Sequence, residues 1–167
     1  PQIMNWDGDK LRGKVITRDI IESAEFYLPK IKADGADIVI AVAHSGLSSA
    51  PYKKGAEQSG AYLASLDGID AVVTGHSHNV FPGPSYAGFP NADLDQGTIY
   101  GKPVVMAGYF GSHLGVIDLD LEYRDGSWSV VTGSGRVRAI KSEGEGGAAP
   151  IHVHSDDTMD CLLYTSD

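Results

Sequence analysis

Three histidines follow short apolar runs, and their spacing suggests a metal site. His44 comes directly after the run 38–43, and His76 follows the run 71–74 with one glycine between. His78 lies two residues further on. Imidazole nitrogens are common ligands of zinc, manganese, iron and similar metals. If both runs are parallel strands, the three side chains converge at the sheet edge where open α/β folds place their sites.

The pair His76 and His78 favours two metal ions over one. In an extended segment, residues i and i+2 point the same way and lie roughly 6 to 7 Å apart. That separation is too long to chelate a single ion comfortably, but it suits two ions about 3.5 to 4 Å apart. Such a pair of ions holds a phosphoryl oxygen and lowers the pKa of a water molecule, which then becomes a nucleophile.

Ordinary explanations of the histidines stay open. A histidine after a strand can simply be a hydrogen-bonded loop residue. We interpret His113, in GYFGSHLG, as such a residue, and we discount His152 and His154 because a tail that we expect to be non-native follows them. Trp6 and Trp128 are expected to be packing residues. A non-catalytic binding module with structural histidines is therefore one alternative.

The elements around the histidines indicate an α/β fold. Residues 37–43 and 68–75 are short, apolar and rich in β-branched residues, which is typical of strands buried on both faces of a parallel sheet. A helix predicted over residues 52–66 completes a βαβ unit. An earlier helix is predicted to begin after an N-cap at Thr17 or Asp19.

Antiparallel strands are predicted to follow the βαβ unit. Residues 79–102 are rich in Pro and Gly and are predicted to form a long loop, and a strand is predicted over 103–110. Asp125 and Gly126 are a hairpin turn signal between two further strands. From Ser142 the sequence SEGEGGAAP is typical of a linker.

Composition limits the classes of partner. A chain of 167 residues can form one domain with a hydrophobic core. No apolar run approaches the roughly 20 residues that span a bilayer. The net charge of −9 argues against a nucleic-acid polymer as partner, although metal ions could still attract a small anionic substrate. The single Cys161 forms no intrachain disulfide and no cysteine zinc site.

The segment VAHSGLS, followed by GIDAVVTGHSHNVFPG, resembles the calcineurin-like metallophosphoesterase superfamily. HSGLS, HNVFPG and GSHLG are similar to the bacterial 2′,3′-cyclic-nucleotide 2′-phosphodiesterase/3′-nucleotidases, which are relatives of the 5′-nucleotidases. This resemblance implies a four-layer αββα domain. It implies that residues 1–141 are the C-terminal half of the catalytic domain, truncated at its N-terminus, and that residues 142–167 are a linker and a non-native tail.

The resemblance also implies two divalent ions of zinc, manganese, iron or cobalt type. In the family, the positions that match His44 and His76 bind the second metal, and the position that matches His78 binds the first. The family motifs Asp-x-His, a bridging Asp and Gly-Asn-His-Asp carry the remaining ligands and a catalytic histidine, and we find none of them here. We therefore assign no catalytic residue in this fragment and expect the isolated chain to be inactive.

The substrates implied by the resemblance are 2′,3′-cyclic nucleotides and 3′-nucleotides, hydrolysed by metal-activated water. A 5′-nucleotidase or a nucleotide-sugar hydrolase of the same superfamily is the alternative among enzymes. The resemblance implies a periplasmic or secreted protein with a small-molecule nucleotide as partner and no membrane association. The last residues, CLLYTSD, match the translation of a sequencing-library transposon adaptor, which is why we expect a non-native tail.

Overall fold

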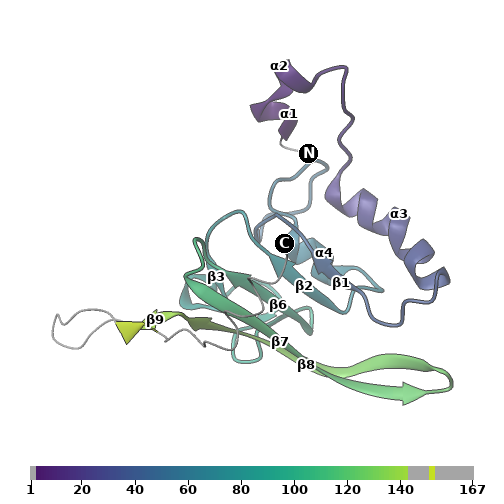
Figure 1. The fold of residues 1–167 in the computed structure, drawn as a ribbon, viewed down its shortest axis with the longest axis vertical. Helices are drawn as coiled ribbons and strands as arrows, with labels where there is room; N and C mark the ends of the chain where they lie inside the picture. The colour runs from purple at the N-terminus through teal and green to yellow at the C-terminus, as the bar shows by residue number, and fades with distance from the viewer. Residues whose placement is uncertain (1–2, 143–150, 153–167) are drawn as a thin grey trace, which may run out of the picture.

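The computed structural model describes residues 3–142 and 151–152, and its centre is a six-stranded mixed sheet (Figure 1). The strand order is β1-β2-β6-β5-β4, and β3 pairs with β6. The strands are β1 (Ile40–Val42), β2 (Ala71–Thr74), β3 (Val80–Phe81), β4 (Ala92–Asp93), β5 (Thr98–Ile99) and β6 (Lys102–Ala107). β1, β2 and β6 are parallel, whereas β3, β4 and β5 pair antiparallel. The predicted α/β class, with a βαβ unit followed by antiparallel strands, is confirmed.

Four α-helices and one 3-10 helix occur in the described residues. They are α1 (Ile3–Trp6), α2 (Gly8–Leu11), α3 (Ile20–Ala33), α4 (Gly60–Ser65) and the 3-10 helix η1 (Pro84–Tyr86). Figure 1 shows α1 and α2 standing away from the sheet. The Asp19 carboxylate caps α3 by accepting hydrogen bonds from the amides of Ile21 and Glu22, which selects Asp19 from the two predicted caps. No helix in this part of the chain is long and apolar enough to cross a membrane.

The two faces of β6 contact different layers of the molecule. Val104 and Met106 are fully buried in the main core, together with Leu63 of α4. Val105 lies on the opposite face, because side chains alternate along a strand. There its Cγ2 lies 3.2 Å from the position that a Cβ on Gly115 would take. The sheet is therefore covered by α4 on one face and by a β-hairpin on the other.

The hairpin consists of β7 (His113–Arg124) and β8 (Ser127–Ala139). Asp125 and Gly126 form its turn with φ values of 54° and 90°, as a tight two-residue turn requires, and the predicted hairpin is confirmed. Gly135 of β8 lies so close to β6 that a Cβ there would be 2.6 Å from the Val104 carbonyl oxygen. Only glycine fits at that contact.

The prediction for strand 37–43 was wrong about burial. β1 covers three residues, and its side chains Ile40 and Val42 are 48% and 79% exposed. It is the outermost strand of the sheet, and β2 is its pairing partner among the described residues. The same apolar pattern gives a buried strand in β2, because β2 lies between β1 and β6.

Two further predictions were wrong in part. The helix predicted over 52–66 is present only as α4, because the chain turns at Gly55, which has a φ of 77°, and stays irregular up to Ser59. The loop predicted over 79–102 contains β3, η1, β4 and β5. At the end of the chain, β9 (Lys141–Ser142) pairs antiparallel with β10 (Ile151–His152). Most of the predicted linker and tail, including His154 and Cys161, lies outside the described residues.

Candidate metal centre

His44 and His76 meet at the carboxyl edge of two neighbouring parallel strands. Val42 of β1 pairs with Val73 of β2, and the amide of Ala43 donates to the Val73 carbonyl at 2.9 Å. The chain therefore leaves both strands side by side. The two imidazole rings that follow are 5.1 Å apart between centroids, at an angle of 67°. Of the three histidines that the sequence predicted to converge, the structure brings His44 and His76 together at this sheet edge.

Ser45 joins the segments that carry this pair. Its side chain is fully buried. Its hydroxyl donates to the Glu57 carbonyl oxygen at 2.7 Å and accepts from the Ser59 amide at 2.7 Å. Its own carbonyl accepts from the Gly75 amide at 3.3 Å, one residue before His76. The loops after β1 and β2 and the segment before α4 are thus held together at one residue, through its hydroxyl and its backbone carbonyl.

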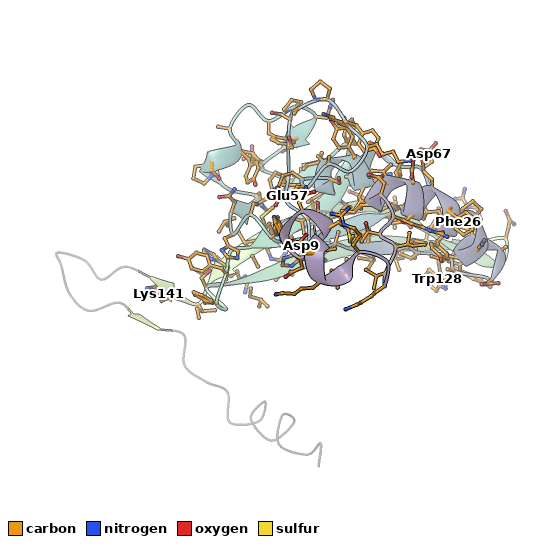
Figure 2. All side chains as sticks on the ribbon, turned by 90° about the horizontal axis from the view of Figure 1, so that it is seen from above. Asp9, Phe26, Glu57, Asp67, Trp128 and Lys141 are labelled. Atoms are coloured by element: carbon orange, nitrogen blue, oxygen red, sulfur yellow. The ribbon has the colours of Figure 1, made fainter. Side chains whose placement is uncertain are left out.

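Glu57 contacts His76 directly. Its carboxylate Oε1 lies 2.6 Å from Nε2 of His76, and the two side chains are 41% and 19% exposed. The indole ring of Trp6 stacks on the same imidazole at 5.7 Å, with 24° between the planes. His76 is therefore restrained at one nitrogen by Glu57, on one face by Trp6 and by a T-shaped ring contact with His44. Figure 2 shows Glu57 between the ends of the molecule that carry Trp128 and Lys141.

His78 lies in different surroundings. His76 and His78 have φ values of 69° and 60°, so the predicted extended segment was wrong. The turn directs His78 toward Tyr109, whose ring stacks on it at 5.1 Å with 20° between the planes. Both rings line a pocket of about 440 Å³ together with His113 and Phe110. The backbone thus gives neighbouring histidines separate environments by turning.

The donor groups fit part of a divalent metal site. His44 and His76 offer imidazole nitrogens, which suit zinc and other first-row metals. Across residues 3–142 and 151–152, no three side chains of His, Cys, Asp or Glu are placed to hold one ion together. A complete site of this kind needs ligands in addition to the histidine pair.

A second polar cluster fixes the segment before Glu57. The Tyr52 hydroxyl donates to Asp19 at 2.6 Å, and the Gly55 amide donates to the same carboxylate at 2.7 Å. Burial alone would raise the pKa of Asp19, but the hydrogen bonds from Tyr52 and from backbone amides outweigh it and lower this pKa. The bond to Asp19 raises the pKa of Tyr52 to about 12. The start of α3 is thereby tied to the loop that leads to Glu57.

Sequence reasoning missed Glu57, Tyr109 and the position of Trp6. Glu57 falls inside a predicted helix, and nothing in its spacing points to His76, which is nineteen residues away. Trp6 was expected to pack, yet it is 60% exposed and contacts His76. Trp128 is 47% exposed and packs on Tyr123 across the hairpin. For Tyr109 a signal existed, because it follows β6, which is parallel to β2 and ends at the same edge.

Comparison with known proteins gives consistent matches. Residues 3–80 match the model of the calcineurin-like phosphoesterase family. The chain is 50% identical over 140 residues to a 2′,3′-cyclic-nucleotide 2′-phosphodiesterase/3′-nucleotidase of Haemophilus influenzae, and 48% identical to one of Salmonella typhimurium. These alignments cover 84% of this chain but only 21% and 22% of those relatives.

A solved structure matches the fold. The crystal structure of the calcineurin-like phosphoesterase YfkN from Bacillus subtilis superposes with a TM-score of 0.80 at 47% identity. The match covers 83% of this chain and 42% of that one. The mixed sheet described above is therefore shared with a phosphoesterase fold.

Proposed function

Residues 3–80 of this chain belong to the calcineurin-like phosphoesterase family, and on that premise we propose that the chain is part of a metal-dependent phosphoesterase. Its substrates are 2′,3′-cyclic nucleotides and 3′-nucleotides. The observation that carries this proposal is the convergence of His44 and His76 at the carboxyl edge of β1 and β2. Proteins of this family use divalent metals, and imidazole pairs at such an edge suit them.

Each histidine has a separate task in the proposal. His44 and His76 would hold one ion, and His78 would hold a second from its own turn beside Tyr109. Two such ions would supply positive charge for the phosphoryl oxygens and would lower the pKa of a water molecule. The contacts of Trp6 and Glu57 keep the His76 ring from rotating, so that its orientation is already set before an ion arrives.

The names of the relatives support the substrate class. Two of them, from Haemophilus influenzae and Salmonella typhimurium, are named as cyclic-nucleotide phosphodiesterases and 3′-nucleotidases, at 48% to 50% identity. Because this chain spans about a fifth of their length, the nucleotide is bound with the help of segments outside it. We expect the isolated 167-residue chain to show little or no turnover.

The test uses the complete protein that contains this chain. Purified protein is assayed with 2′,3′-cyclic AMP, 3′-AMP, 5′-AMP and UDP-glucose, and its metals are counted by mass spectrometry. His44→Ala and His76→Ala should each lower kcat/KM at least about 100-fold and reduce the metal content. The matched control is Trp128→Ala, which removes an aromatic side chain on the exposed hairpin and should change neither quantity.

The outcomes separate the candidate functions. A preference for 5′-AMP or UDP-glucose would replace the proposal by a 5′-nucleotidase or a nucleotide-sugar hydrolase. Metal-free protein without turnover on any of the four substrates would favour a binding module with structural histidines. About two ions per chain, with turnover of the cyclic nucleotide and of 3′-AMP, is the expected result.

The domain division and the location belong to the same proposal. Residues 1–141 form the second half of a catalytic domain, and residues 142–167 form a linker and a non-native tail. The complete protein is periplasmic or secreted in this proposal. Fractionation of cells that express the complete gene tests the location, and enrichment in the cytoplasmic fraction would contradict it.

A further inference from the structure

We propose that Glu57 is a positioning residue that holds His76 in its Nε2–H tautomer and leaves Nδ1 as the nitrogen that binds a divalent ion. A neutral imidazole has one N–H donor and one free lone pair. An ionised carboxylate can only accept, so the contact of 2.6 Å between Glu57 and Nε2 places the hydrogen on Nε2. This inference rests on the proposed function, because that function supplies the ion.

The surroundings of His76 agree with this assignment. Trp6 stacks on the ring and His44 makes a T-shaped contact with it, whereas the hydrogen-bond contact of the His76 side chain runs from Nε2 to Glu57. Among the described residues, Glu57 is the one carboxylate within ion-pair distance of a histidine. In a metal-binding histidine, the ring nitrogen that does not bind the metal commonly donates a hydrogen bond to a carboxylate. This hydrogen bond fixes the tautomer and raises the basicity of the nitrogen that binds the metal.

Glu57 is itself held in place from two sides. Its carbonyl oxygen accepts from the hydroxyl of Ser45, the residue after His44. Two residues earlier, the Gly55 amide donates to the buried Asp19. The carboxylate therefore projects from a segment anchored both to the His44 loop and to the start of α3. The hydroxyl of Ser45, which follows His44 in the chain, therefore also fixes the backbone of Glu57, whose carboxylate orients His76.

The first readout is the tautomer, measured on the 167-residue chain without metal. Long-range ¹H–¹⁵N correlation spectra at pH 8 report which nitrogen of each histidine carries the hydrogen. We expect Nε2–H for His76 in the wild type and in Glu57→Gln, whose amide oxygen still accepts. Glu57→Ala should give a mixture of tautomers. The control Glu22→Ala removes a carboxylate that pairs with Lys54 at 2.5 Å, and it should leave the His76 signals unchanged.

The second readout is the affinity of the complete protein that contains this chain for Zn²⁺, measured by competition with a chromophoric chelator. Glu57→Ala should weaken binding about 10- to 100-fold, Glu57→Gln should weaken it less, and Glu22→Ala should not weaken it. Near-ultraviolet circular dichroism checks that each variant is folded. A wild-type His76 with its hydrogen on Nδ1, or the same tautomer balance in Glu57→Ala as in the wild type, would overturn the inference. If the complete wild-type protein binds no Zn²⁺, the metal site of the proposed function fails, and the tautomer alone decides the role of Glu57.

Discussion

The hydroxyl of Ser45 donates a hydrogen bond of 2.7 Å to the carbonyl oxygen of Glu57, and this contact couples the His44 loop to the segment whose carboxylate contacts His76. Ser45→Ala removes that donor and leaves the buried Ser59 amide without its acceptor. The free energy of unfolding should fall by about 1 to 3 kcal/mol, the usual cost of an unsatisfied buried group. Chemical denaturation measures it.

Ser65→Ala is the matched control for that experiment. The Ser65 hydroxyl donates to the Tyr62 carbonyl on the exposed side of α4, so water can replace it. A change of less than about 0.5 kcal/mol is expected there. Equal losses in the two variants would mean that burial at Ser45 has no special effect.

The Asp19 carboxylate stabilises two elements, so its removal should cost more than the loss of a helix cap. Asp19→Ala deletes the N-cap of α3 and the bonds to Tyr52 and Gly55. We expect a loss of roughly 2 to 4 kcal/mol, the sum of a cap and two part-buried hydrogen bonds. Asp19→Asn keeps a capping oxygen and should lose roughly half as much. Thermal unfolding compares them with Asp34→Ala, a change at the exposed end of the same helix.

The lowered pKa of Asp19 predicts a specific loss of stability in acid. Its folded-state pKa lies below the ordinary value of 3.8, so the unfolded chain binds the proton more readily. The stabilisation is complete above the unfolded-state value and disappears as the pH falls through the folded-state value. Unfolding free energies measured from pH 6 to pH 2 should therefore decrease more steeply for the wild type than for Asp19→Asn. Parallel curves would exclude Asp19 as a source of acid sensitivity.

The contact between the hairpin and β6 should tolerate no side chain at Gly135. A Cβ there would lie 2.6 Å from the Val104 carbonyl and 2.7 Å from the Gly97 carbonyl. Gly135→Ala should destabilise the protein by about 1 to 3 kcal/mol through overpacking. Gly75→Ala is the control, since a Cβ at Gly75 would meet nothing within 4 Å. Circular dichroism during denaturation measures both, and an unaffected Gly135→Ala would refute the close contact.

Elements governed by local signals were predictable from the sequence. The apolar run before His76 gave β2, the pair Asp125 and Gly126 gave the hairpin turn, and Asp19 gave the start of α3. In each case the signal lies in the residues that form the element. The convergence of His44 and His76 was also predictable, because parallel neighbouring strands end at one edge.

Features that depend on distant partners were not predictable in this way. The burial of a strand depends on what covers it, so the similar runs of β1 and β2 gave different exposures. The contact of Glu57 with His76 depends on α4 beginning at Gly60, which leaves Glu57 in an irregular segment near the sheet edge. His76 and His78 both adopt a left-handed backbone conformation, although neither is a glycine, so residue type alone did not predict the turn.

The exposed position of β1 has a practical consequence for the isolated chain. Within the described residues β1 pairs only with β2, so its other side, with apolar side chains such as Ile40 and Val42, offers backbone groups to which a strand of another molecule can add. Copies of the chain should therefore self-associate as their concentration rises. Spectroscopic and binding measurements are then best made in the low micromolar range, with light scattering as a check on aggregation.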